Sequence, residues 1–154
     1  MEQVIDSKEE LIETVQYVAT EATALAHQIL GKTFPISSLT VFAHSQEEYL
    51  LLVAILAEMG EPFNEQNGPR VALHEPLVVG RNTITHLRIR QPDSERPQVG
   101  CCDFDTDYAV FDEEYLKKFP QSLTHIMRPG YEMIEFHDPE FDVLAYVVST
   151  EEEV

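Results

Sequence analysis

The sequence predicts an α+β protein in which a long N-terminal helix precedes a curved, mixed β-sheet. Two observations support this fold class. Residues 5–31 have the apolar spacing of one helix, and residues 38–90 and 99–149 repeat the order strand, helix, strand, strand, strand. We therefore predict a single domain over residues 1–154, in which two β-α-β-β-β modules share one sheet.

The predicted N-terminal helix has clear signals at both ends. Ser7 and Glu10 have the spacing of a capping box, and Gly31 has the position of a terminating residue. Between them, apolar residues alternate at spacings of four and three: Leu11, Val15, Val18, Ala22, Leu25 and Ile29. Such a stripe either docks on the sheet of its own chain or pairs with a second copy in a homodimer, and we favour docking.

The first module is predicted from a β-type run over residues 39–43 and a second capping box, Ser45 with Glu48. The helix that follows, 46–59, is apolar around most of its circumference, which indicates burial against a sheet, and Gly60 ends it. A loop over 61–68 and strands over 70–74, 77–79 and 83–90 complete the module. Residues 91–98, with two prolines, form the linker.

The second module is predicted to begin with a strand over 99–105. Asp112 is expected to cap a short helix over 113–119, with Phe111 and Leu116 as a hydrophobic staple. Strands are expected over 122–127, 131–137 and 143–149, and the acidic run 151–153 is expected to be a solvated tail.

Composition excludes several classes of partner. The chain has 28 acidic and 10 basic residues, and its net charge of −18 repels phosphate backbones and anionic membranes. We therefore expect no nucleic-acid and no membrane partner. Because there is no signal sequence and no apolar run of membrane-spanning length, we predict a cytoplasmic protein. The adjacent Cys101 and Cys102 point to opposite faces of a strand, which disfavours a disulfide between them.

Strand parity indicates which polar side chains share a face. If Leu39, Val41 and Ala43 face the helices, then His44 faces the concave side of the sheet. One consistent choice of face for the remaining strands places five further residues on that side: His86, Arg88, Asp103, Glu135 and His137. Arg88 stands out in so acidic a chain, because a planar guanidinium suits a carboxylate or phosphate of a ligand.

The paired β-α-β-β-β units resemble the vicinal oxygen chelate superfamily of glyoxalases, extradiol dioxygenases and bleomycin-resistance proteins. Within it, the chain is most similar to the YecM-like group. The segments that carry this resemblance are the leading helix, Val41-Phe42-Ala43-His44, Leu73-His74-Glu75-Pro76 and Ile134-Glu135-Phe136-His137.

The resemblance implies a divalent metal (Zn, Mn, Ni or Fe) held by residues on the first and last strands of the modules. Carried over by position, His44, His86 and Asp103 are the expected ligands. At the fourth position the chain departs from the superfamily pattern, because the last strand offers only Asp142 or Tyr146. Glu135, one strand earlier, is the remaining candidate, both as a ligand and as a general base.

Two functions of different classes follow. The first is a glyoxalase-like, metal-dependent isomerase or lyase acting on a small carbonyl or carboxylate compound, with Glu135 as the catalytic residue and Arg88 and His137 as ligand contacts. The second is a metal-free protein that binds or sequesters a small molecule on the same concave face. An acidic scaffold that binds a basic partner is a third interpretation of the net charge.

Overall fold

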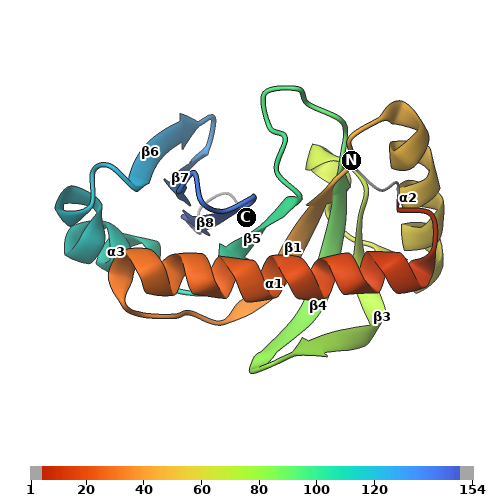
Figure 1. Cartoon of the computed structure of the whole chain (residues 1–154), viewed down its shortest axis with the longest axis horizontal. Helices are drawn as coiled ribbons and strands as arrows, with labels where there is room; N and C mark the ends of the chain where they lie inside the picture. The colour runs from red at the N-terminus through yellow and green to blue at the C-terminus, as the bar shows by residue number, and fades with distance from the viewer. Residues whose placement is uncertain (1–4, 150–154) are drawn as a thin grey trace.

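The computed structural model of the protein describes residues 5–149 and shows an α+β fold built on one eight-stranded mixed sheet (Figure 1). The long helix α1 spans Lys8–Leu30. The first module follows, in the order β1 Ile36–Phe42, α2 Gln46–Met59, β2 Gly60–Pro62, β3 Arg70–Val79 and β4 Asn82–Arg90, with a single 3-10 turn, Glu65–Asn67, before β3. The predicted fold class is confirmed.

The second module repeats the order of the first. It contains β5 Gly100–Phe104, α3 Tyr108–Tyr115, β6 Leu123–Arg128, β7 Tyr131–Phe136 and β8 Val143–Val148, and a 3-10 turn, Leu116–Lys118, extends α3. The predicted tail over 151–153 lies outside the described residues.

The strand order of the sheet is β2-β3-β4-β1-β5-β8-β7-β6. In each module the first strand pairs in parallel with the last, β1 with β4 and β5 with β8. The two modules meet where β1 and β5 pair antiparallel. The two first strands therefore lie at the centre of the sheet, where residues from both modules come together.

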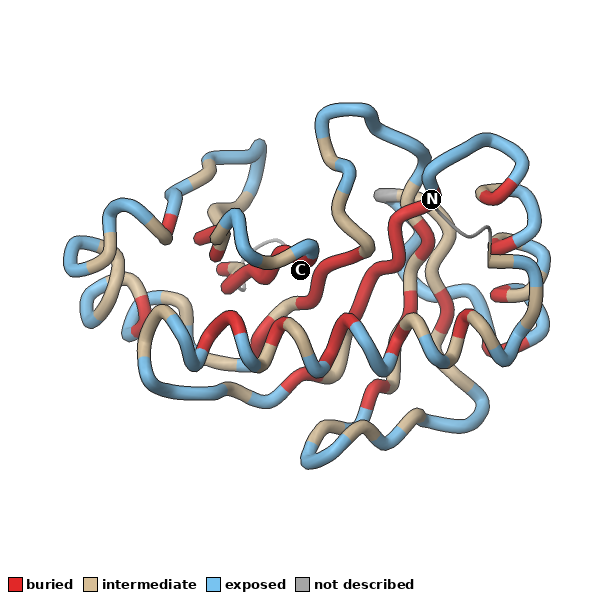
Figure 2. The backbone as a smooth tube through the Cα atoms, viewed as in Figure 1, coloured by how far each residue is buried: buried red, intermediate tan, exposed pale blue. Residues whose placement is uncertain are grey.

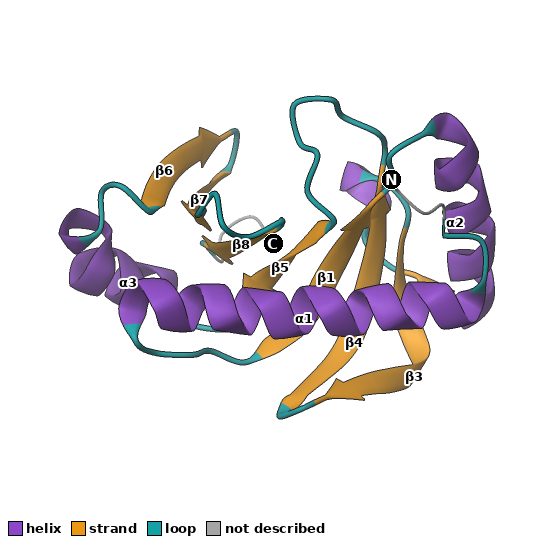
Figure 3. Cartoon of the chain, viewed as in Figure 1, coloured by secondary structure: helices purple, strands orange, loops and turns teal. Residues whose placement is uncertain are grey.

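Helix α1 docks on the sheet of its own chain, as predicted. The Ser7 side chain accepts a hydrogen bond from the Glu10 backbone N–H, and Gly31 ends the helix with a φ of 71°. The apolar stripe is buried from Leu11 to Leu25. It packs against strands of both modules, β1 and β3 from the first and β5 and β8 from the second, as Figure 3 shows for its path across the strands.

Helix α2 is less buried than its apolar sequence predicts. Glu48, Leu52, Leu56 and Met59 form its buried face, whereas Leu50 is 60% exposed. Gly60 ends the helix in an extended conformation and not as a left-handed cap. A Cβ atom at this position would lie 2.2 Å from the carbonyl oxygen of Ala72, so glycine lets the chain pass directly into β2.

Two other predicted elements differ from the structure. The strands expected over 70–74 and 77–79 are one strand, β3, with an irregular register between Ala72 and Leu77. Helix α3 begins five residues earlier than expected, because Asp107 and not Asp112 caps it by accepting from the Val110 N–H. Phe111 is thereby carried inside the helix, where its ring packs on Phe34 and Phe136.

The core lies on the helix side of the sheet. All three α-helices contribute buried residues to one large apolar cluster, together with alternate residues of the strands (Figure 2). A second, smaller cluster lies on the opposite face, which we call the open face: Phe42, Cys101, Leu144 and Tyr146. In residues 5–149, no helix is long and apolar enough to cross a membrane.

Candidate functional site

A row of polar side chains crosses the open face from one module to the other. Strand pairing places His86 opposite Ser38, Ser38 opposite Asp103, and Asp103 opposite Tyr146. Tyr146 in turn lies opposite Glu135. Residues paired directly across strands share a face. The structure therefore places His86, Asp103 and Glu135 in a single row, although three strands lie between the strand of His86 and that of Glu135.

His44 lies beyond the end of β1 and does not join this row. Its Nε2 atom is 2.8 Å from the carbonyl oxygen of Gln98 and 3.2 Å from that of Pro97. Its backbone N–H donates to Glu48 Oε1 at 2.7 Å. Two carbonyl acceptors require a proton on Nε2. His44 thus fixes the segment between β4 and β5 to the start of α2.

His137 follows the end of β7, at the margin of the sheet. Its Nε2 atom lies 2.9 Å from the hydroxyl of Thr124 on the edge strand β6. Because Thr124 lies opposite Glu135, this histidine extends the same face at its outer limit. It is remote from Arg88, which is on the other module.

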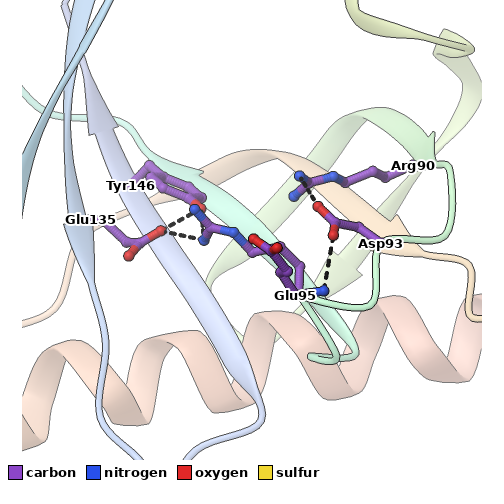
Figure 4. Close-up of polar contacts among 6 residues, drawn as sticks. Arg90, Asp93, Glu95, Glu135 and Tyr146 are labelled. Carbon is purple, nitrogen blue, oxygen red and sulfur yellow. Dashed lines mark hydrogen bonds and ion pairs between the residues drawn. The ribbon is translucent and has the colours of Figure 1, made fainter.

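Glu135 is held by two donors at the second-module end of the row. Arg96 Nη1 donates to Glu135 Oε2 at 2.6 Å, and the Tyr146 hydroxyl donates to the same oxygen at 2.8 Å. Figure 4 shows Glu135 and Tyr146 side by side, with dashed contacts reaching them from the β4–β5 connection. The carboxylate raises the pKa of Arg96, and burial, more than this contact, raises the pKa of Tyr146.

Sequence reasoning missed Arg96, because it lies in the linker and no periodic pattern gives the direction of its side chain. Its position between two prolines gave no signal of a role. Only the fold reveals that the linker passes over the sheet and brings Arg96 to Glu135.

The first-module end of the open face is rich in arginine. Arg88 on β4 lies opposite Arg70 on β3, and its Nε atom donates to Thr40 Oγ1 at 3.3 Å. Arg90 lies over the Phe42 ring, 4.9 Å from its centroid. In residues 5–149, Arg96 and Arg90 each form a salt bridge, with Glu135 and Asp93 respectively, whereas Arg88 forms none.

His86 packs against an aromatic ring that also contacts a cation. The centroids of the Phe63 and His86 rings are 4.5 Å apart, and the guanidinium of Arg70 lies over Phe63, 5.3 Å from its centroid. His86 Nδ1 is 2.9 Å from the Thr85 hydroxyl. Burial and, to a smaller extent, the charge of Arg70 lower the pKa of His86. The ring is therefore neutral at neutral pH.

The two cysteines are free and buried, on opposite faces of β5. Burial is the main cause that raises the pKa of Cys101 to about 12, and it also raises the pKa of Cys102 well above its ordinary value. A thiol is a nucleophile or a metal ligand only as a thiolate. Cys101 therefore contributes to the open face as an apolar side chain.

The side chains predicted to hold a metal do not form a suitable donor set. In residues 5–149, no three His, Cys, Asp or Glu side chains converge as metal ligands do. Both ring nitrogens of His44 face oxygens of its own chain, and Glu135 is bound by Arg96. Strand β1 lies between His86 and Asp103. Two strand spacings put the backbones of these residues about 9.5 Å apart.

A groove of about 450 Å³ lies elsewhere, between α1 and the turn that joins β3 to β4. Its polar lining consists of neutral side chains and Arg81, and it contains none of the predicted site residues. On the open face, by contrast, Arg90 lies over the Phe42 ring of the apolar cluster and Arg96 bonds to the Tyr146 hydroxyl. His86, Arg96 and Tyr146, whose pKa values are shifted, lie on this face, so we place the candidate site there.

Fold and site together define an α+β protein of two β-α-β-β-β modules, with all helices on one face and an arginine-rich opposite face. One solved structure with this fold is described as "Structural Genomics, Protein EC4020". It aligns with 98% of this chain over 97% of its own length, with a TM-score of 0.58 and 15% sequence identity, which shows similarity of fold alone. No protein-family model and no curated protein matches the sequence.

Proposed function

We propose that the protein binds a small anionic molecule, a carboxylate or a phosphate, on the open face and without a metal. The observation that carries this proposal is the concentration of Arg70, Arg88, Arg90 and Arg96 on one face of a chain that has only 10 basic residues and a net charge of −18. A guanidinium binds the two oxygens of such a group with two parallel hydrogen bonds.

Arg88 is the residue that we assign to the anion. Its neighbours Arg90 and Arg96 are neutralised by carboxylates of the chain, while Arg88 donates to the neutral Thr40 hydroxyl. The dispersed acidic residues elsewhere repel a polyanion, so a small ligand that reaches only the arginines fits better than nucleic acid.

The test is a titration with inorganic phosphate and with acetate, followed by the backbone amide signals of β1 and β4 in proton–nitrogen correlation spectra. We expect saturable shifts in the wild-type protein. Arg88→Met should weaken binding about tenfold to a hundredfold, since a hydrogen bond to a charged group contributes about 1.5–3 kcal/mol. Arg128→Met, which removes an exposed arginine from the edge strand β6, is the matched control.

An unchanged affinity in Arg88→Met would contradict the proposal. The metal-dependent isomerase or lyase remains the competing hypothesis, and metal content per chain distinguishes the two. Near-stoichiometric metal that is lost in both His86→Ala and Asp103→Asn would contradict metal-free binding and support the enzyme.

A further inference from the structure

The connection between β4 and β5, residues 91–99, is a strap over the open face. It rises from the sheet between the two modules (Figure 1) and is tied down at both ends. Near its start, Asp93 accepts from Arg90 at 3.3 Å and from the Glu95 N–H at 2.9 Å. Near its end, Val99 bonds with the backbone of Phe42 and of Asp142.

The apolar cluster of the open face is buried although every described helix lies on the other side of the sheet. Phe42 is 2%, Leu144 4%, Tyr146 6% and Cys101 7% exposed. Ile126, Met133 and Val148 pack against this cluster, the guanidinium of Arg90 lies over the Phe42 ring, and that of Arg96 bonds to the Tyr146 hydroxyl at 3.3 Å. One arginine immediately precedes the strap and the other belongs to it.

The two arginines of this cover do not belong to the apolar core on the other face of the sheet. The side chains of Arg90 and Asp93 are 38% and 39% exposed, and ion pairs open to solvent contribute little to stability. Arg96 is held on the sheet by Glu135 and Tyr146 alone, within the described residues. One polar atom of the strap, Gln98 Oε1, is buried with no hydrogen-bond partner among residues 5–149. A buried acceptor that lacks a donor is rare, and a ligand or a second position of the strap would supply one.

We propose that the strap is a gate and that the ligand of the open face is an amphiphilic anion, an aromatic carboxylate or sulfonate. When Arg96 leaves Glu135 and Tyr146, the ring of the ligand lies on the cluster of Phe42, Cys101, Leu144 and Tyr146. Arg88 and the released Arg96 then bind its acid group. This inference rests on the proposed anion binding and adds the apolar part of the ligand and the movement that admits it.

Two features of the cluster favour an aromatic ring as the occupant. Phe42 and Tyr146 offer aromatic surface of their own, against which a flat ring packs in offset or edge-on geometry. A guanidinium is weakly hydrated and planar, so an arginine of this face can pack on the ring of the ligand as Arg90 does on Phe42.

The probe for the experiment is anilinonaphthalene sulfonate, an aromatic anion whose fluorescence rises in apolar surroundings. We expect one saturable site per chain and nuclear Overhauser contacts from its ring protons to the methyl groups of Leu144. Glu135→Gln keeps the shape of the side chain that holds Arg96 but removes its negative charge, which weakens the contact and releases Arg96. We expect this variant to bind the probe about fivefold more tightly.

The matched control is Glu132→Gln, which removes the same charge from the same strand but on its other face, where Glu132 pairs with His125. It should bind the probe as the wild type does. Equal tightening in both variants, or contacts to Leu50 on α2 in place of Leu144, would overturn the gate. If phosphate still shifts β4 in that case, anion binding stands without the gate, and if it does not, both proposals fail.

Discussion

At the scale of single residues, the burial of His86 makes the stability of the fold depend on pH. Burial and the nearby Arg70 charge disfavour its protonated form in the folded protein, so its folded pKa lies below the value of about 6.5 in the unfolded chain. As the pH falls below about 6.5, the unfolded chain takes up a proton that the folded protein resists. The stability associated with neutral His86 is therefore present above about 6.5 and is lost as the pH falls toward its lowered folded pKa.

We predict that His86→Gln loses less stability than the wild type between about pH 7 and about pH 5. The measurement is the free energy of unfolding by urea at several pH values in this window. His27→Gln, at an exposed position near the end of α1, should follow the wild type and serves as the control. Parallel curves for wild type and His86→Gln would show that burial of this ring does not affect its protonation.

Parity in the sequence predicted which strand residues share the open face, but it could not predict what covers them. Arg88 and Asp103 follow from the alternation of strands, since a side chain two residues along returns to the same face. The hydrogen-bond partner of Glu135 is Arg96, which belongs to a linker without hydrophobic periodicity. Its position is therefore known only once the whole chain is folded. For His44 a sequence motif predicted a metal ligand, whereas in the structure its ring contacts a backbone carbonyl oxygen.

At the scale of elements, the junction of the modules depends on close contact between two strands. Gly100 begins β5 and lies opposite Val41 on β1. A Cβ atom at Gly100 would be 2.4 Å from the Thr40 carbonyl oxygen and 3.0 Å from Val18 Cγ2 on α1. Because the nearest obstacle is backbone, the strands would have to separate to admit a methyl group.

We therefore predict that Gly100→Ala lowers the free energy of unfolding by about 3 kcal/mol, as overpacking of a rigid site does. The control is Gly130→Ala in the turn between β6 and β7, where a Cβ atom meets open space and only the positive φ of 89° opposes it. That change should cost about 1 kcal/mol. Urea denaturation measures both, and equal losses would mean that the junction yields easily.

Elements with local signals at both ends were predicted well, and elements set by tertiary contacts were not. Helix α1 has a side-chain cap and a left-handed glycine, and it spans Lys8–Leu30 between the predicted end residues Ser7 and Gly31, within the predicted range 5–31. The break expected near Pro76 is an irregularity inside β3, because proline removes one donor without ending the strand. Helix α3 begins at Tyr108 since the burial of Phe111 requires an earlier turn, which Asp107 caps.

At the scale of the whole molecule, the net charge of −18 opposes the compact state. Acidic side chains brought together by folding repel one another, and salt screens this repulsion over about 10 Å at 0.1 M. We predict that the thermal midpoint rises between about 10 mM and about 500 mM sodium chloride. Circular dichroism measures it, with an equally concentrated neutral osmolyte as the control. A falling midpoint would mean that specific ion pairs outweigh the net repulsion.

The order of helices and strands along the chain was predictable because the same order occurs in both modules. The pairing of β1 with β5 was not, since nothing in either strand specifies which neighbour it takes from the other module. That pairing decides that His86 and Asp103 lie on opposite sides of one central strand, and so it also decides that the predicted donors do not meet.

The packing of α1 across both modules has a consequence for synthesis on the ribosome. The helix emerges before the sheet, yet one of the strands that cover its apolar stripe is β8, whose residues are made more than a hundred positions later. Chains fold from the N-terminus as they are made, and apolar surface exposed in the meantime is prone to aggregate. The apolar stripe of α1 from Leu11 to Leu25 is therefore not fully covered until Val143–Val148 has left the ribosomal exit tunnel.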